Sequence, residues 1–260
     1  MLLCIDVGNT HTHFGVVETK GARFLQHIPT REIDHYADGM GPQMSRVFAE
    51  HPGVMGVAYC SVVPEATERL QRVFERWHLA CPVFQLTCDK KLGIPISYPR
   101  PTEIGQDRLA NAAGAHALVG SPVIVIDMGT AVTFDIVTAT RGYEGGIIAP
   151  GVELMRRYLH EQTALLPRLD ENLEVTRAIG QSTVEAMRIG TVLGFGGMIQ
   201  ALLDAVNAEL AARGEAPPRV LTTGGTADLL RKTLRTPFQV VPDLTLRGLA
   251  AAWALNRPPE

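Results

Sequence analysis

The chain has 260 residues, 46% of them hydrophobic and 20% charged, with a formal net charge of -3 at pH 7. This composition is that of a soluble globular protein, long enough for one large domain or two of ordinary size. A slightly acidic chain gives no electrostatic reason to expect nucleic acid or an anionic membrane as a partner. No apolar run reaches spanning length and the N-terminus lacks the pattern of a signal peptide, so we expect a cytoplasmic protein.

The spacing of cysteines and histidines argues against a metal site built from these residues. The eight histidines form no HExxH pattern, and there is no CxxC pair. We therefore expect reduced thiols. The four cysteines are Cys4, Cys60, Cys81 and Cys88.

The chain opens with a short apolar strand that ends in a carboxylate. Residues 2–5 are apolar, Asp6 follows, and Gly8 allows a sharp turn before a second strand-like run over residues 12–17. This pattern predicts a β-hairpin. Taken alone, a plain polar hairpin turn is the better interpretation of the residues between the strands.

Strands and helices alternate in the remainder of the first half. We expect a strand over 54–60, a Ser-Val-Val-Pro turn, a helix over 65–78 and a strand over 82–87. An irregular, proline-rich stretch over 92–102 then precedes an Ala-rich helix over 105–120.

The opening motif returns near the middle of the chain, where residues 123–137 repeat the order apolar strand, Asp-x-Gly, Thr, second strand. The corresponding pairs are Asp6 and Asp127, Gly8 and Gly129, and Thr10 and Thr130. Two such motifs about half a chain apart indicate duplicated domains, which we place at residues 1–119 and 120–260.

The second half continues with a long helical pattern over 183–213, interrupted by glycines. A buried strand over 219–225 ends in a Gly-Gly turn, and a helix over 244–255 follows. Alternation of strands and helices after each hairpin predicts a mixed α/β sheet with helices packed against it.

Two carboxylates at glycine turns suit a complex of nucleotide and metal. Backbone N–H groups in tight glycine turns can hold phosphate oxygens, while the carboxylates hold a hydrated cation. The sequence contains no GxxxxGK[ST] loop and no GxGxxG after a strand. Close helix packing explains the GFGG run at 194–197, and no GxSxG elbow suggests acyl transfer.

Several separate motifs, in one order, make the chain similar to the type III pantothenate kinases, of the superfamily of actin, sugar kinases and heat-shock ATPases. DVGNT at 6–10 resembles the first phosphate motif, GQDR at 105–108 the substrate motif, and DMGT at 127–130 the second phosphate motif. The segments GGIIAPG, TALLP, GQST and TGG follow in the same order.

This resemblance implies two duplicated ribonuclease H-like (actin-like ATPase) domains, each a mixed β-sheet flanked by helices, with a cleft between them. The first domain would carry the first phosphate motif and the pantothenate motif. The second would carry the second phosphate motif, the adenosine-side glycines Gly224 and Gly225, and dimer contacts. The implied reaction is ATP-dependent phosphorylation of pantothenate to 4'-phosphopantothenate, the first step of coenzyme A synthesis, by a homodimer.

The resemblance also implies roles for the residues of the two phosphate motifs. Asp6 would orient Mg²⁺ through water, and Asp127 would bind a monovalent cation, K⁺ or NH₄⁺. Turn-stabilising hydrogen bonds are the alternative for both aspartates, and a hairpin turn is the alternative for the two adenosine-side glycines. The implied ATP contacts are Asp6, Val7, Gly8, Asn9, Thr10, His11, Thr12, His13 and Thr130.

The implied pantothenate contacts are Tyr98, Gly105, Gln106, Asp107, Arg108 and Thr183. Asp107 is the candidate catalytic base, because a carboxylate can accept the proton of the attacking hydroxyl. Its alternative is an N-cap of the Ala-rich helix. Arg108 would bind the pantothenate carboxylate, or else pair with Glu103.

Two further assignments have structural alternatives. Tyr98 would line the pantothenate pocket or simply cover the core. Thr183 would reach the partner's site across a dimer interface or cap the helix that follows it. His160 is not counted among the residues of the pantothenate pocket, because a lone histidine is more often structural.

Two other functions compete with the kinase. One is a catalytically silent regulatory protein on the same fold that binds nucleotide or a partner, since fold alone does not establish activity. The other is a kinase for a different small hydroxyl substrate. The presence of Asp6, Asp107, Arg108 and Asp127 favours an enzyme, and Tyr98 with the Gly-x-Asp-Arg pattern favours pantothenate.

Overall fold

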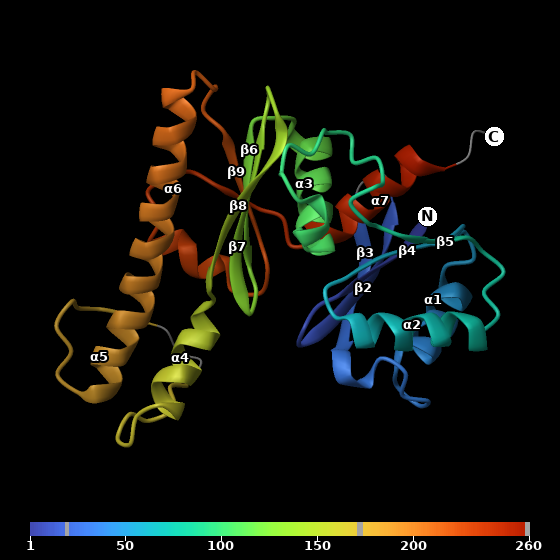
Figure 1. The fold of residues 1–260 in the computed structure, drawn as a ribbon. Helices are drawn as coiled ribbons and strands as arrows, with labels where there is room; N and C mark the ends of the chain where they lie inside the picture. The colour runs from blue at the N-terminus through green and yellow to red at the C-terminus, as the bar shows by residue number, and fades with distance from the viewer. Residues whose placement is uncertain (19–20, 171–173, 258–260) are drawn as a thin grey trace. The chain divides into compact units, whose positions relative to one another are not determined.

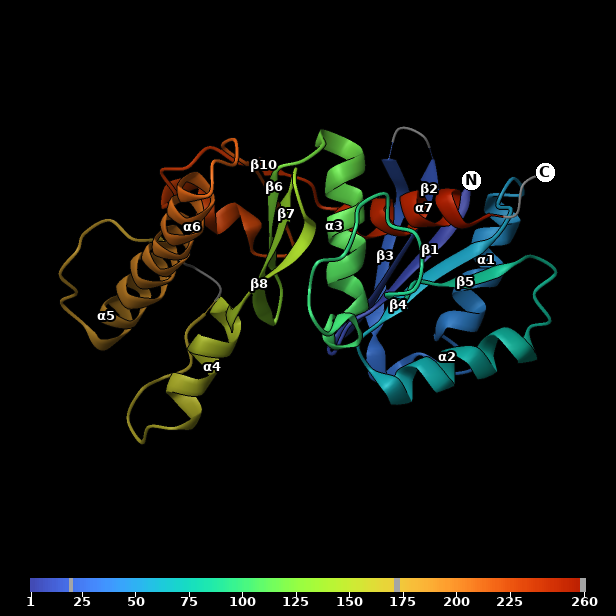
Figure 2. The ribbon, with the colours of Figure 1, turned by 45° about the horizontal axis from the view of Figure 1, so that its top comes forward.

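The computed structural model describes residues 1–18, 21–170 and 174–257, and divides into two compact units (Figures 1 and 2). Unit 1 consists of Met1–Gly120, Arg141–Gly145 and Asp243–Glu260. Unit 2 consists of Ser121–Thr140 and Gly146–Pro242. The first segment of unit 1 ends next to the expected boundary. The C-terminal segment, which the sequence analysis assigned to the second domain, belongs to unit 1.

The sheet of unit 1 has the strand order β3-β2-β1-β4-β5. Its central strand, β1, pairs antiparallel with β2 and parallel with β4, and β5 extends the sheet parallel to β4. The strands are β1 (Leu2–Val7), β2 (His11–Glu18), β3 (Gly21–Pro29), β4 (Val57–Ser61) and β5 (Val83–Gln85).

Helices cover both faces of this sheet (Figure 1). Because side chains alternate along a strand, Leu3 and Ile5 join the core formed with α1 (Met40–Glu50) and α2 (Pro64–Arg76). The opposite face of β1 and β4 lies against α3 (Gln106–Val119) and α7 (Leu244–Asn256). Asp6 and Cys60 belong to this second face by the same alternation.

The helices α3 and α7 approach each other at backbone distance. A Cβ atom added to Gly248 would lie 1.8 Å from the carbonyl oxygen of Ala110, and one added to Gly114 would lie 2.7 Å from that of Leu244. Only glycine permits these contacts. This packing explains why the C-terminal helix is part of unit 1.

The sheet of unit 2 repeats the arrangement, in the order β10-β9-β6-β7-β8. Its central strand β6 is antiparallel to β7 and parallel to β9, as β1 is to β2 and β4. The predicted duplicated, mixed α/β architecture is therefore confirmed. The strands are β6 (Val123–Met128), β7 (Ala131–Thr138), β8 (Gly142–Pro150), β9 (Arg219–Thr223) and β10 (Gln239–Val240).

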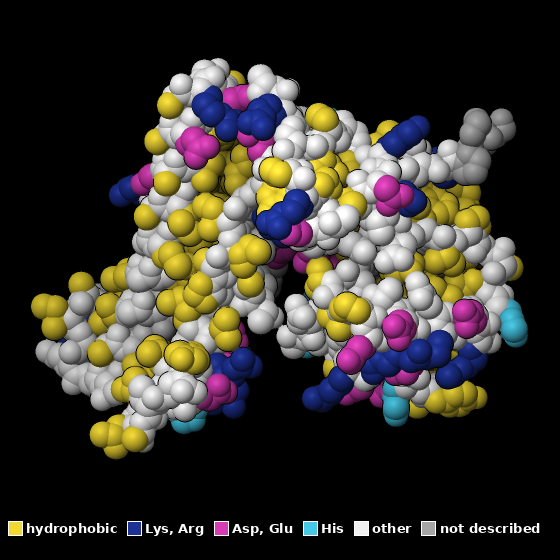
Figure 3. Space-filling model, in the orientation of Figure 1, with side chains coloured by type: hydrophobic (Ala, Val, Ile, Leu, Met, Phe, Trp, Pro, Cys, Tyr) yellow, Lys and Arg dark blue, Asp and Glu magenta, His cyan; other side chains and the backbone are white. Residues whose placement is uncertain are grey.

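The long helical pattern of the second half is divided into α5 (Thr183–Ile189), a π-helical turn (Gly190–Gly194) and α6 (Phe195–Ala212). One face of α6 and part of α4 (Val152–Glu161) pack on the sheet of unit 2. Apolar side chains also lie exposed in this region of the surface (Figure 3). The continuous run of 30 residues is long and apolar enough to cross a bilayer, although core helices of soluble proteins often are as well.

Candidate active site

The first glycine turn is held by Thr30, the residue that follows β3. The Thr30 hydroxyl donates to the carbonyl oxygen of Gly8 (2.7 Å) and shares a hydrogen bond with the hydroxyl of Thr12 (3.1 Å). The backbone N–H of Thr30 donates to the carbonyl oxygen of Thr10 (3.0 Å). Thr30 is far from the motif in sequence, and no local pattern predicts this role for it.

The residues of the first turn differ in how far their side chains are exposed. Asn9 and Thr10 are exposed, whereas Val7 and Thr12 are buried, so the latter two offer a ligand mainly their backbone. Asp6 is half-buried at the end of β1, in register with His13 on β2 and Cys60 on β4. The predicted phosphate turn is thus a loop held in place by the hydrogen bonds of Thr30, with the side chains of Asn9 and Thr10 exposed.

Three histidines gather beside this turn, on β2 and β3. The ring centroid of His27 lies 5.2 Å from that of His11 and 5.5 Å from that of His13. Burial and the neighbouring histidines lower the pKa of His13, which favours its neutral form. His27 joins the cluster only through the pairing of β2 with β3, so the motif spacing gave no signal for it.

The second glycine turn lies in unit 2 and is packed differently. Asp127 is half-buried at the end of β6, and Thr130 is exposed. The backbone N–H of Gly151 donates to the carbonyl oxygen of Thr130 (3.1 Å), and a Cβ atom at Gly151 would lie 2.4 Å from that oxygen. The end of the segment GGIIAPG therefore lies directly against the turn.

The two predicted adenosine-side glycines differ in how closely they are packed. Gly224 has φ +88°, and a Cβ atom there would lie 2.6 Å from the backbone of Met128, so it packs the TGG segment against the second turn. A Cβ atom at Gly225 would meet nothing within 4 Å. The hairpin alternative is wrong, because β9 runs parallel to β10 and the segment leads into a 3₁₀ helix at Ala227–Lys232.

Asp107 lies in the first turn of α3, half-buried, and is not its cap. Gly105 occupies the N-cap position, with no side-chain cap bond, so the capping alternative for Asp107 is wrong. The Asp107 carboxylate accepts a hydrogen bond from the backbone N–H of Arg108 (2.8 Å). Burial raises the pKa of Asp107, and this backbone bond and the charge of Arg108 oppose the increase.

Glu103 and Gly105 both come shortly before Asp107 in the chain, and each makes a contact near the start of α3. Glu103, the proposed partner of Arg108, forms an ion pair with Arg100 (2.9 Å). A Cβ atom at Gly105 would lie 2.5 Å from Oδ1 of Asp107, so glycine is what leaves room for this carboxylate.

The last two residues of β4, Cys60 and Ser61, contact the two parts of unit 1 that carry Asp6 and Asp107. The Cys60 thiol donates to Oδ1 of Asp6 (3.3 Å), and the backbone N–H of Ser61 donates to Oε1 of Gln106 (2.9 Å). Burial, together with the charges of Asp6 and Asp107, raises the pKa of Cys60 well above its ordinary value, so the thiol stays protonated. The sequence predicts only a reduced thiol at Cys60, with no sign of this contact.

Tyr98 is half-buried and belongs to a segment that is fastened to residues 141–145. The backbone N–H of Ser97 donates to the carbonyl oxygen of Tyr143 (2.8 Å), and Ile96 forms a parallel bridge with the same residue. Gly145 has φ +135°, and a Cβ atom there would lie 3.2 Å from the Tyr98 ring. The start of the segment GGIIAPG therefore supports the ring of Tyr98.

Thr183 is the first residue of α5 and is exposed, but it is not the cap. The Ser182 hydroxyl accepts a hydrogen bond from the backbone N–H of Glu185 (3.2 Å), and the Glu185 carboxylate accepts one from the backbone N–H of Gln181 (2.7 Å). This arrangement resembles a capping box. The Thr183 side chain is therefore not needed to begin the helix.

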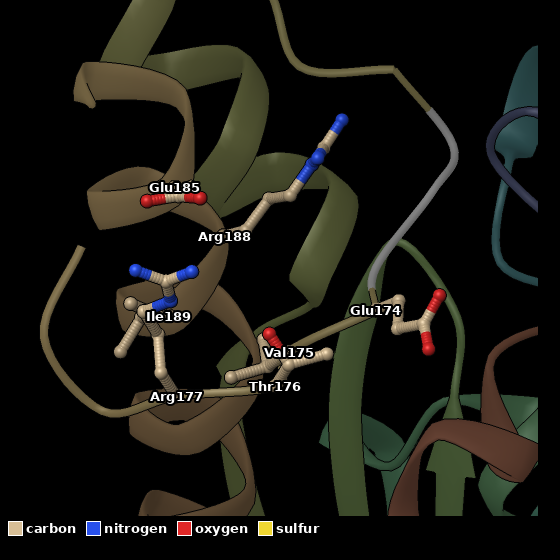
Figure 4. A pocket seen from close by; sticks show the side chains of 7 residues that line it. All are labelled: Glu174, Val175, Thr176, Arg177, Glu185, Arg188 and Ile189. Carbon is tan, nitrogen blue, oxygen red and sulfur yellow. The ribbon is translucent and has the colours of Figure 1, made fainter. Parts of the chain in front are cut away.

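A small cavity of about 170 Å³ lies between α5 and the segment before it (Figure 4). It contains none of the predicted site residues. Arg188 lines it and binds both carboxylate oxygens of Asp170 (2.8 and 2.7 Å), a structural link within unit 2. The lining residues are Glu174, Val175, Thr176, Arg177, Glu185, Arg188 and Ile189.

The hydrogen bonds of Thr30 predict how the first turn responds to substitution. Thr30→Val keeps the shape of the side chain but removes the donor to Gly8, and should reduce the free energy of unfolding by about 1–3 kcal/mol. Amide hydrogen exchange at residues 8–11 should become faster. Thr30→Ser, which keeps the hydroxyl, should leave that exchange close to the wild-type rate. Equal exchange in the valine and serine variants would contradict the role of Thr30.

Comparison with known proteins agrees with these motifs. The family model described as type III pantothenate kinase matches residues 2–205. A type III pantothenate kinase from Akkermansia muciniphila is 42% identical over 261 residues, covering 98% of each chain.

Two solved structures share the fold. A Baf family protein from Campylobacter jejuni is 19% identical with a TM-score of 0.63, covering 98% of each chain. A ROK hexokinase from Thermus thermophilus is 14% identical with a TM-score of 0.52, covering 97% of this chain and 98% of that one. From the family match over most of its length and from this identity, the chain belongs to the type III pantothenate kinase family.

Proposed function

We propose that this protein transfers the γ-phosphate of ATP to the primary hydroxyl of pantothenate, giving 4'-phosphopantothenate for coenzyme A synthesis. The observation that carries the proposal is Asp107, a half-buried carboxylate in the first turn of α3, two residues after the N-cap Gly105. Its charge and that of Asp6 both act on the same thiol, Cys60, so the two carboxylates border one region of unit 1.

The residues of unit 1 supply what the reaction needs. Asp107 accepts the proton of the attacking hydroxyl. If the proton leaves late in a loose transition state, the main effect of Asp107 is to orient the hydroxyl group. Arg108 binds the pantothenate carboxylate. Tyr98, supported by Gly145, forms a wall of the substrate pocket. The resemblance also assigns Gly105 and Gln106 to the substrate segment.

The donor set fits a hydrated magnesium ion. Mg²⁺ at nucleotide sites is usually bound by one or two carboxylates and the phosphates themselves. Among the described residues no group of three or more His, Cys, Asp or Glu side chains, the three histidines included, is placed to hold a metal ion, and Asp6 is a single carboxylate beside the first turn. Bound Mg²⁺ would neutralise phosphate charge, while Asp6 orients its water shell and the turn positions the phosphates.

The direct test measures ADP release from purified protein with ATP and Mg²⁺, with and without pantothenate. We expect release that depends on pantothenate, and little release with sugars or other small alcohols. Stimulation by another hydroxyl compound but not by pantothenate would indicate a different kinase. Nucleotide binding without release under any cation condition would indicate the regulatory function.

Asp107→Asn tests the assignment of the base. The amide cannot accept the hydroxyl proton, so kcat should fall by about 10²–10⁴-fold, while calorimetry should show pantothenate still bound by Arg108 and Tyr98. Because burial raises the pKa of Asp107, the ionised carboxylate costs folding free energy at neutral pH, and the amide should not lower stability.

Asp89→Asn is the matched control, because Asp89 is an exposed aspartate of the same unit. It should leave kcat unchanged. A raised pKa also predicts that the wild-type kcat declines, on acidification, at a higher pH than an ordinary carboxylate would give. Near-normal kcat in Asp107→Asn would remove Asp107 from this role.

We also propose a requirement for a monovalent cation, bound with the help of Asp127. The support is the resemblance and the half-buried position of this carboxylate at the second turn. Replacing potassium or ammonium with sodium or tetramethylammonium at constant ionic strength should lower turnover. Asp127→Asn should have low activity that no longer responds to potassium. Turnover independent of the cation would rule out this role.

A homodimer formed through the α5–α6 region is the third part of the proposal. Gly190, Gly194 and Gly197 are exposed, and a Cβ atom at any of them would meet nothing within 4 Å. Glycines on an open helix face let another helix approach closely. Large apolar side chains stand exposed nearby, including Leu193 (46%) and Ile179 (80%). A second copy of unit 2 would cover this surface, which suits a cytoplasmic protein better than a bilayer does.

Leu193→Glu should convert the dimer to a monomer in light scattering, because it places a charge in the proposed dimer interface. Leu118→Glu, at an exposed leucine of α3 in unit 1, is the matched control and should leave the mass unchanged. If Thr183 serves the partner's site, Thr183→Ala should raise the KM for pantothenate without changing the mass. A fully active wild-type monomer at assay concentration would contradict the proposal.

A further inference from the structure

The two candidate carboxylates of unit 1 are connected through consecutive residues of β4. Cys60 lies in register with Asp6 on the neighbouring strand β1, and its thiol donates to Oδ1 of Asp6 (3.3 Å). The next residue, Ser61, donates its backbone N–H to Oε1 of Gln106 (2.9 Å). Gln106 is the first residue of α3 and immediately precedes Asp107. A short piece of one strand therefore contacts Asp6 directly and the start of the helix that carries Asp107.

The amide of Gln106 is held by more than this one contact. Nε2 of Gln85 on β5 also donates to Oε1 of Gln106 (3.4 Å). The Tyr59 hydroxyl donates to Oε1 of Gln85 (3.0 Å) and accepts from Nε2 of Gln71 on α2 (3.2 Å). These bonds link α2, β4 and β5 to the first residue of α3. The Gln106 side chain thus faces protein groups, although its motif places it among the substrate contacts.

We propose that Cys60 and Gln106 are positioning residues for phosphoryl transfer, with the end of β4 setting the place of Asp6 and Asp107 relative to each other. Cys60 holds the carboxylate of Asp6 in one orientation. Gln106 fixes the first turn of α3 and therefore the backbone of Asp107. The kinetic part of this inference rests on the proposed kinase activity.

The physical reason is that phosphoryl transfer depends mainly on positioning and electrostatic stabilisation. Displacement of a reacting group by about 1 Å can reduce a rate by about 10²-fold. A thiol is a weak hydrogen-bond donor, so the bond from Cys60 adds little to folding stability. Its effect should therefore appear in the orientation of Asp6 more than in the unfolding temperature.

The first experiment compares Cys60→Ala with Cys60→Ser. The alanine variant lacks the donor, so we expect about a tenfold weaker apparent affinity for Mg²⁺ in the assay and a lower kcat. The serine variant keeps a donor and should recover most of the loss. Cys81→Ala is the matched control, because Cys81 is a half-buried cysteine of the same unit that packs against the core with α1 and α2. Alanine and serine variants that both match the wild type in Mg²⁺ dependence would overturn the role of Cys60.

The second experiment separates positioning from substrate binding at Gln106. Gln106→Met keeps the length of the side chain but removes the acceptor, so kcat should fall about tenfold or more while the KM for pantothenate stays within about twofold. Tyr59→Phe breaks the network one step further away and should lower kcat less. A Gln106→Met variant with raised KM and unchanged kcat would identify a substrate ligand and overturn the positioning role.

A binding measurement distinguishes failure of this inference from failure of the proposed function. Calorimetry of Mg²⁺–ADP binding to wild type and Cys60→Ala needs no turnover. If the wild type shows no kinase activity, the proposed function fails. Weaker Mg²⁺-dependent ADP binding by Cys60→Ala than by Cys60→Ser would still support the link to Asp6, and equal binding would refute it.

Discussion

The constraint on which both units depend is a central strand that is buried along its length and carries an aspartate where it emerges. The strands β1 and β6 have the same burial pattern, with the aspartate half-buried at the fifth of six positions. Each is bracketed by an antiparallel and a parallel neighbour, so its backbone hydrogen bonds are satisfied on both sides. A carboxylate is tolerable only where such a strand reaches the turn. The fold thus places Asp6 and Asp127 at equivalent points of two similar sheets.

Close backbone approaches supported by glycine then fix the loops around these strands. Gly151 and Gly224 each bring a later segment against the second turn, where any side chain would collide with backbone atoms. In unit 1 the first turn is fixed differently, by the hydroxyl and backbone of Thr30. The duplicated turns therefore share their strand geometry but not their supports.

The elements predicted from the sequence are those with strong local patterns. The two hairpins, the helix before His78 and the Ala-rich helix all appear within a few residues of their expected positions. The strands β3 and β8 were missed because their polar and glycine residues hide the alternation, and α1 because glycine and proline lie in its first turn. The place of α7 in unit 1 depends on Gly248, whose role is visible only once Ala110 is beside it.

For the candidate site, too, the sequence predicts only those features that have a strong local pattern. Aspartates, glycines and Arg108 can be read from motifs, but their supports come from distant segments. Thr30, Cys60 and Gln85 belong to no motif, and they reach the site because they lie on paired strands or directly after one. Local sequence also could not decide whether Asp107 or Thr183 caps a helix. Those questions depended on neighbours: Gly105 is the cap in one helix and Ser182 in the other.

Two features of this fold cost stability. Burial disfavours the ionised form of Asp107, and the hydrogen bond from the backbone N–H of Arg108 offsets this only in part. Gly190, Gly194 and Gly197 stand exposed in a continuous helical segment, where each glycine is less favourable than alanine by about 1 kcal/mol. Departures of this kind are expected where function constrains a sequence. The first suits a base that must lie beside a substrate hydroxyl, and the second suits a helix face reserved for a second copy. Both therefore agree with a dimeric kinase more closely than with a silent monomer on the same scaffold.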